Sequence, residues 1–169
     1  MEKTIKIINE LQKKGLIKNY AIGGGIATIF YVEPILTYDL DILFISVREK
    51  EGLITLSPIY NYFKKRGYHT KKEHIIIEGI PVQFIPAYNE LVKEAVENSV
   101  ETKYKKTKTK IFKPEYLIAI MLQTFRPKDR ERIIKLLDEA KIDMKYLMKI
   151  LHRYGLIEKF ERFMRLYYE

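Results

Sequence analysis

Three consecutive glycines, Gly23–Gly25, constrain the fold of this chain more than any other feature of its sequence. They close "YAIG", which is typical of a short strand, and they open "GGIATIFYV", which is typical of a helix. A turn of this kind lets a ligand approach the backbone closely, because glycine has no side chain. The N–H groups at a helix start attract phosphate. We therefore expect Gly24 and Gly25 to bind the phosphates of a nucleotide through their amides.

Two aspartates, Asp39 and Asp41, follow the glycines at a short distance. They belong to the apolar, β-rich segment that runs through "LDILFIS", and residues two apart in a strand face the same side. Two carboxylates on one face repel each other and resist burial unless a cation lies between them. Mg²⁺ typically binds one or two carboxylates together with substrate phosphates. Asp39 and Asp41 are therefore predicted to hold Mg²⁺ or Mn²⁺ beside a bound NTP.

Other glycine-rich phosphate sites do not fit this stretch. A dinucleotide-binding fingerprint requires a glycine where Thr28 stands, and it requires an acidic residue about 20 positions further on. A P-loop requires Gly-Lys-Ser/Thr, and no lysine follows these glycines. A tight turn after a buried strand would explain the glycines, but it would leave the aspartate pair without a reason.

The rest of the chain predicts an α+β fold, with a mixed sheet flanked by helices in front and an all-helical part behind. Helical periodicity and helix-stop glycines predict helices near residues 5–15, 57–67 and 89–98, and from Pro114 to the end. The segment "EHIIIEGIPVQFIP" reads as a hairpin, and "VETKYKKTKTKIF" reads as one or two lysine-rich strands. We expect an α/β core over residues 1–113 and a helical C-terminal subdomain over residues 114–169, packed on a shared core.

Composition limits the partners of the chain. Its 169 residues include no cysteine, which excludes disulfides and Cys-ligated metal sites. No stretch approaches the roughly 20 uncharged apolar residues of a membrane helix, so we expect a cytoplasmic protein without a membrane partner. Abundant Ile, Lys and Glu indicate a thermophile or an AT-rich genome. The net charge of +9 suits an anionic partner such as RNA or a nucleotide, and lysines spread over the surface explain it equally well.

The stretch "GGIATIFYVEPILTYDLD" resembles the signature of the DNA polymerase β-like nucleotidyltransferase superfamily, which is Gly-Gly or Gly-Ser, about a dozen residues, and then Asp-x-Asp. The order of elements is similar to that of the small bacterial and archaeal members, which include minimal nucleotidyltransferases and abortive-infection (AbiEii-like) toxins. The resemblance implies metal-dependent transfer of a nucleoside monophosphate from an NTP, with Asp39 and Asp41 as catalytic residues. The acceptor would be RNA such as tRNA, a protein or a small molecule, and a cognate toxin or antitoxin protein is a further possible partner.

The segment "RPKDRERIIKLL" is similar to the Lys-Asp segment that the toxin-like members carry in their helical part. The resemblance implies that Lys128 is a catalytic residue that steadies the triphosphate, and that Asp129 orients the triphosphate or a ligand water. A solvated, capped helix start explains the same residues equally well, because acids early in a helix are favourable.

The family places a third carboxylate on a neighbouring strand, and Gln83 stands at that position here. Strand alternation allows Gln83 to face the aspartates, but an amide carries no charge and accepts no proton. Three outcomes stay open. Glu78 or another acid substitutes, one metal suffices, or the fold is a catalytically impaired nucleotide-binding or antitoxin-like regulatory module. Gly25 stands where many members have serine, so any hydroxyl contact to phosphate falls to Thr28 or Thr37.

The remaining polar and aromatic residues are assigned structural roles. The lysines of "KYKKTKTK" guard an edge strand or, as the alternative, bind an RNA backbone. Aromatic residues of the last two helices lie at helical spacing and are predicted to form core or a dimer face. Three histidines show no ligand spacing and are predicted to be ordinary surface or hydrogen-bonded residues: His69, His74 and His152.

Overall fold

The computed structural model describes residues 1–47 and 56–169. Within these residues, the strands form one mixed sheet in the order β3-β4-β5-β2-β1-β7-β6. The strands are β1 (Asn19–Ile22), β2 (Leu40–Ile45), β3 (His69–Lys71), β4 (His74–Ile77), β5 (Ile80–Pro86), β6 (Val100–Tyr104) and β7 (Thr107–Ile111). Strand β2 lies at the centre, antiparallel to β1 and parallel to β5.

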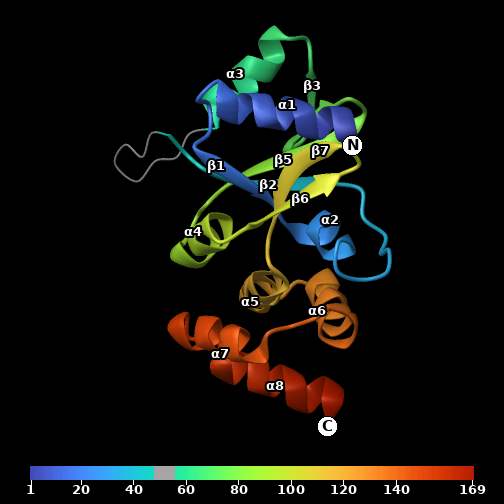
Figure 1. The fold of residues 1–169 in the computed structure, drawn as a ribbon, viewed down its shortest axis with the longest axis vertical. Helices are drawn as coiled ribbons and strands as arrows, with labels where there is room; N and C mark the ends of the chain where they lie inside the picture. The colour runs from blue at the N-terminus through green and yellow to red at the C-terminus, as the bar shows by residue number, and fades with distance from the viewer. Residues whose placement is uncertain (48–55) are drawn as a thin grey trace.

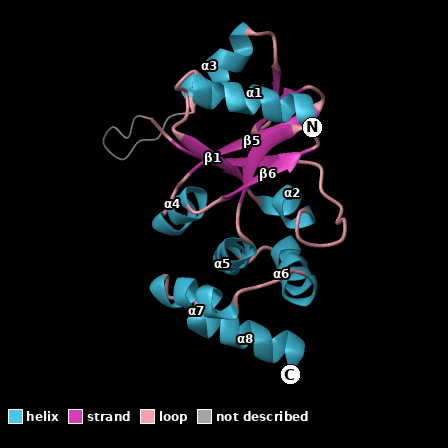
Figure 2. Cartoon of the chain, viewed as in Figure 1, coloured by secondary structure: helices cyan, strands magenta, loops and turns pink. Residues whose placement is uncertain are grey.

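Helices cover both faces of the sheet. The helices of the described residues are α1 (Glu2–Lys13), α2 (Gly24–Ile29), α3 (Ser57–Lys65), α4 (Glu90–Glu97), α5 (Pro114–Thr124), α6 (Pro127–Glu139), α7 (Met144–Arg153) and α8 (Ile157–Tyr168). Helices α1 and α3 lie over one face, and α2 and α4 lie over the other (Figure 1). Helices α5 to α8 stack beyond α2 and α4, so the sheet lies near one end of the molecule and the C-terminus at the other (Figure 2). The predicted α+β class, with a mixed sheet and C-terminal helices, is confirmed.

Local sequence signals account for several element boundaries. The Asn89 side chain caps α4 by accepting from the Val92 amide, and Asp143 caps α7 by accepting from the Tyr146 amide. Glu78 and the glycine after it both have positive φ, which is the backbone of a two-residue hairpin turn and joins β4 to β5. The predicted lysine-rich segment forms the two strands β6 and β7, which pair as a hairpin.

The structure differs from the predicted elements in two places. Strand β3 was not predicted, because all three of its residues are exposed and the segment lacks alternation. Helix α2 ends at Ile29, earlier than "GGIATIFYV" suggested. Pro34 disfavours helical backbone at the residue before it, so the chain leaves the helix in a turn over residues 30–33.

The predicted boundary at residue 113 falls between β7 and α5. Side chains from both sides belong to one continuous hydrophobic core, as Phe112 after β7 and Leu117 of α5 illustrate. The division into residues 1–113 and 114–169 stays a prediction. No helix in the described part of the chain is long and apolar enough to cross a membrane.

Candidate functional site

Gly24 and Asp41 lie directly against each other. Gly24 is the first residue of α2 and has a φ of +56°, and a Cβ built there would collide with Oδ2 of Asp41. Asp41 lies one residue into β2, and the amide of Gly23 donates to its carbonyl at 3.0 Å. The glycine bend and the second aspartate therefore form adjacent walls of one site, as their order in the sequence predicted.

Gly23 and Gly25, on either side of Gly24, also lie against side chains that leave no room for a Cβ. A Cβ at Gly23 would collide with the Leu43 side chain and would lie 3.1 Å from the Phe112 ring. A Cβ at Gly25 would lie 2.6 Å from the hydroxyl of Thr37 and 2.8 Å from Nη2 of Arg132. Gly23 thus permits packing of the core, whereas Gly25 brings a hydroxyl and a guanidinium close to the start of α2.

The two threonines that were candidates for a phosphate contact behave differently. Thr28 is buried, and its hydroxyl donates to the Gly24 carbonyl at 2.9 Å inside α2. Thr37 is half-buried in the segment before β2, and its hydroxyl lies beside Gly25. The Thr28 hydroxyl is therefore already paired inside α2, and a phosphate contact of Thr37 stays a prediction.

A row of polar residues crosses three neighbouring strands. Asp41 on β2 is in register with Gln83 on β5, and Gln83 is in register with His74 on β4. Residues opposite each other in a ladder point to the same face, so these three side chains share one face of the sheet. Gln83 therefore lies beside Asp41, as strand alternation predicted, and no acid replaces it in this row.

Asp39 lies just before β2 and belongs to the same cluster. Its side chain is 52% exposed, and its Oδ2 lies 3.7 Å from Nε2 of His74. Because His74 is in the row with Asp41, the two aspartates share one face, with Asp39 at the solvent edge and Asp41 further inside. His74 was predicted to be an ordinary surface or hydrogen-bonded residue, but its side chain is only 16% exposed and its Nε2 has no hydrogen-bond partner among the described residues.

The positive charges near Asp41 do not fully offset the burial of its carboxylate. Burial raises the pKa of the Asp41 carboxyl above its usual range. The guanidinium groups of Arg126 and Arg132 and the ring of His74 act in the opposite direction, and Asp39 adds to the upward shift of this pKa. The surrounding charges thus do not fully compensate the burial of an ionised carboxylate. A cation bound beside Asp41 would supply the missing compensation.

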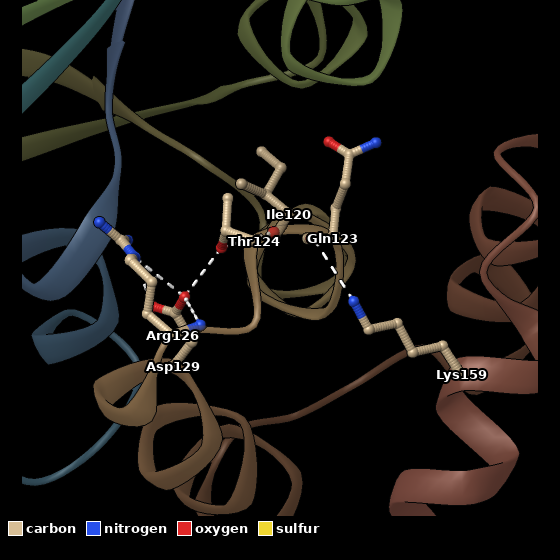
Figure 3. Close-up of polar contacts among 6 residues, drawn as sticks. All are labelled: Ile120, Gln123, Thr124, Arg126, Asp129 and Lys159. Atoms are coloured by element: carbon tan, nitrogen blue, oxygen red, sulfur yellow. Dashed lines mark hydrogen bonds and ion pairs between the residues drawn. The ribbon is translucent and has the colours of Figure 1, made fainter.

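Arg126 is held by a buried carboxylate at the turn between α5 and α6 (Figure 3). Asp129 has no exposed surface, and its Oδ2 accepts from Nε of Arg126 at 3.0 Å and from the Thr124 hydroxyl at 2.8 Å. The Arg126 amide donates to the same oxygen at 2.9 Å, and Nη2 of Arg126 donates to Oδ1 at 3.2 Å. Burial alone would raise the pKa of Asp129, but these hydrogen bonds outweigh it and hold the pKa below its usual range.

Helix α8 supports the same turn from the other side. The ammonium group of Lys159 donates to the carbonyl oxygen of Gln123 at 3.4 Å (Figure 3). The same group lies 4.9 Å from the centre of the Phe125 ring. Phe125 itself has a left-handed backbone with a φ of 48°, which turns the chain sharply between the two helices. Helix α8 therefore contacts the turn that precedes Arg126.

Lys128 and Asp129 lie in different environments. Asp129 is fully buried and bonded to Arg126 and Thr124, so its carboxylate holds the Arg126 side chain, and an orienting role toward a triphosphate or water stays a prediction. Lys128 is exposed near the start of α6, and its contact with a triphosphate stays a prediction. The cations whose charge acts on Asp41 are instead Arg126 and Arg132.

A cavity of about 250 Å³ opens beside Asp41. Its polar lining consists of Gly24, Asp41, Gln83, Tyr88, Thr124 and Arg126. Its apolar lining consists of Leu43, Ile85, Phe112, Leu117, Ile120 and Met121. The polar groups come from both the sheet and the helical part, so the cavity has a charged edge and an apolar wall, which is the usual character of a small-molecule site.

Several site residues escaped the sequence analysis. The position of His74 follows from the predicted hairpin, because a two-residue turn at Glu78 and Gly79 places residue 74 opposite Gln83. Arg132 gave no comparable signal, because its approach to Gly25 depends on how α6 packs near α2.

Sequence comparison finds no match: neither a protein-family model nor a curated protein matches the chain. Its structure is similar to an antigenic nucleotidyltransferase-like protein from Paracoccidioides brasiliensis, with a TM-score of 0.57 and 15% sequence identity over 89% of this chain and 84% of that one. The antibiotic-resistance factor ANT(2'')-Ia gives a TM-score of 0.48 and 13% identity over 96% of this chain and 99% of that one. The chain has a nucleotidyltransferase-like fold.

The donor set at the site of this nucleotidyltransferase-like fold fits one divalent cation but not two. Asp39 and Asp41 supply two carboxylates, which is sufficient for one ion whose other positions are taken by water and phosphate. Gln83 supplies only a neutral oxygen, so the charge for a second ion is missing. Among residues 1–47 and 56–169, no three His, Cys, Asp or Glu side chains are already gathered around a common point in the way a metal ion requires.

Replacing Asp129 by asparagine is expected to destabilise the chain by about 1–3 kcal/mol at pH 7, because the amide keeps only one acceptor oxygen and no charge for the donors of Arg126 and Thr124. The pKa of Asp129 is lowered in the folded state. The wild-type advantage is therefore present above the unfolded-state pKa of about 3.9 and disappears as the pH falls through the lower folded-state value. Urea unfolding at pH 7 and pH 3 measures both effects.

The matched control for this substitution is Glu131→Gln, which alters an exposed acid on the same helix. It should leave the unfolding free energy nearly unchanged. Equal stabilities of Asp129→Asn and wild type at pH 7 would contradict the role assigned to this carboxylate.

Proposed function

We propose that the chain is a nucleotidyltransferase that transfers a nucleoside monophosphate from an NTP to an acceptor hydroxyl. The observation that carries this proposal is the contact between the Asp41 carboxylate and the glycine that opens α2. A backbone bend without side chains and a carboxylate that lacks charge compensation lie side by side. A metal–nucleotide complex satisfies both, because its phosphates suit the bend and its cation suits the carboxylate.

The proposed roles divide between the sheet and the helices. Asp39 and Asp41 would hold Mg²⁺ or Mn²⁺, which when bound polarises the phosphate oxygens and offsets their charge. The backbone of Gly24 and Gly25 would receive the β- and γ-phosphates. Arg126 and the neighbouring cation of α6, Arg132, would stabilise the charge that develops on the departing pyrophosphate.

In the transfer itself, an oxygen of the acceptor forms a bond to the α-phosphorus while the bond to the bridging oxygen of pyrophosphate breaks. The electron pair leaves with pyrophosphate, and the acceptor proton passes to solvent. Gln83 cannot take that proton, because a neutral amide is not a base in water.

A catalytically impaired nucleotide-binding module is the second candidate function. The position of Gln83 beside Asp41 favours it, since this residue occupies the place where a third carboxylate would stand. In this alternative the same contacts hold an NTP without turnover, and the protein acts as a regulatory or antitoxin-like partner.

The acceptor and the biological setting belong to the proposal as well. A net charge of +9 supports RNA, including tRNA, as the acceptor. The resemblance of the glycine–aspartate stretch supports the small bacterial and archaeal branch with its minimal and toxin-like members. A cognate toxin or antitoxin protein is proposed on the same ground.

Incubation with radiolabelled NTPs, Mg²⁺ or Mn²⁺ and total RNA tests the enzyme proposal. We expect label transfer by the wild-type chain and a loss of at least about a hundredfold in Asp39→Asn, because one of two cation ligands becomes neutral. The matched control is Asp138→Asn, an exposed aspartate on α6 outside the site. Tight nucleotide binding without transfer to RNA, protein or small molecules would favour the impaired module.

A further inference from the structure

The imidazole of His74 has a buried nitrogen without a partner at the solvent edge of the candidate site. Its Nε2 atom is buried and finds no hydrogen-bond partner among the described residues. The side chain as a whole is only 16% exposed. Buried polar atoms in proteins are almost always paired, so an unpaired one requires an explanation. An ion bound between His74 and its neighbours would give this nitrogen a partner.

The neighbour that faces this nitrogen is the carboxylate of Asp39. The distance of 3.7 Å between Nε2 and Oδ2 is too long for a hydrogen bond. It is compatible with two ligands of one ion, since atoms that each lie about 2.1 Å from a metal are at most about 4.2 Å apart. The pair is thus spaced for an ion between them.

The register of the sheet explains why a histidine is placed here. His74 on β4 lies opposite Gln83 on β5. Gln83 in turn lies opposite Asp41 on β2. Strand β5, next to Asp41, contributes the uncharged Gln83 to this row. Strand β4, the next one along, contributes the imidazole nitrogen of His74. A donor that Gln83 cannot provide is therefore available one strand further along the same row.

We propose that His74 is a direct ligand of the cation at this site, together with Asp39, and that it makes the site prefer a first-row transition-metal ion such as Mn²⁺ over Mg²⁺. The inference rests on the proposed function, because it concerns the same cation. Neutral imidazole is a good ligand for transition-metal ions, whereas Mg²⁺ selects oxygen. The remaining coordination positions fall to Asp41, water and substrate phosphates.

Mn²⁺ binding to the full-length chain without nucleotide tests this inference directly. Electron spin-echo spectroscopy of the bound Mn²⁺ should show ¹⁴N modulation from a coordinated imidazole in the wild type. The modulation should be absent in His74→Ala and should persist in His69→Ala, which alters an exposed histidine on the adjacent strand β3. Titration calorimetry should show Mn²⁺ affinity at least about tenfold lower in His74→Ala, with a smaller change for Mg²⁺.

Three results separate this inference from the proposed function. Saturated Mn²⁺ binding to the wild type without ¹⁴N modulation overturns the ligand assignment, and this measurement does not depend on whether the variant folds. Unchanged Mn²⁺ affinity in a folded His74→Ala also overturns it and leaves nucleotide transfer intact. Mn²⁺ bound through His74, without NTP binding under any metal, supports the metal site and overturns the transferase.

Discussion

Replacing Gly24 by alanine is expected to abolish metal-dependent nucleotide binding and to destabilise the chain by roughly 2–5 kcal/mol. The φ of +56° at this residue costs a side-chain-bearing residue about 1–2 kcal/mol. The added methyl group would also collide with the Asp41 carboxylate, which has to turn away from the bend, and overpacking of this kind adds about 1–3 kcal/mol. Thermal unfolding should show a midpoint lower by about 5–15 °C.

Gly15→Ala is the matched control for this substitution. Gly15 has a φ of +70°, and an added Cβ would meet no described atom within 4 Å. It therefore carries the same backbone strain without the collision, and it should lose about 1–2 kcal/mol while nucleotide affinity stays at the wild-type level. If Gly24→Ala bound nucleotide as tightly as Gly15→Ala, the contact between the bend and Asp41 would have no functional role.

The glycines and aspartates could be read from the sequence because their signals are local. Three glycines between a strand and a helix specify a bend, and two aspartates two positions apart in a strand specify a shared face. Their contact was predictable because β1 and β2 are antiparallel neighbours joined through α2, so Gly24 follows β1 at the end where Asp41 begins β2. Gln83 was predictable by the same alternation on the next strand.

The cations of the site could not be assigned from the sequence. The segment "RPKDRERIIKLL" offers several positive side chains within two helical turns, and local reasoning does not determine which of them faces the sheet. The choice depends on the left-handed turn at Phe125, on the buried acceptor Asp129 and on the support from Lys159. The turn and the Asp129 bond are local, whereas the Lys159 contact and the packing of α6 near the sheet are tertiary, and in the folded chain Arg126, not Lys128, lines the cavity with Asp41.

His74 shows how a residue can be missed when it is considered alone. A single histidine without ligand spacing in the sequence gives no sign of a metal site, but strand pairing brings it within 3.7 Å of Asp39 across a distance of 35 positions in the chain (74 − 39). Its role depends on register, which the turn at Glu78 had already determined. Reasoning from strand to strand, rather than along each strand, would have found it.

Replacing Asp41 by asparagine is expected to abolish metal-dependent nucleotide binding without destabilising the free protein. The pKa of Asp41 is raised in the folded state because the carboxyl is buried, so its ionisation opposes folding above that pKa. A neutral amide of the same shape removes this penalty, and the thermal midpoint at pH 7 should stay unchanged or rise. Bound cation and NTP should raise the midpoint of the wild type but not that of the variant.

The opposite directions of these two effects make the Asp41 substitution the most informative one. Loss of binding through unfolding would lower the midpoint, whereas loss of a ligand carboxylate leaves a stable protein that no longer responds to metal and NTP. Titration calorimetry with NTP and Mn²⁺ should show at least a hundredfold weaker binding in Asp41→Asn, about 2.7 kcal/mol. Wild-type affinity in a folded Asp41→Asn would mean that this carboxylate does not hold the cation.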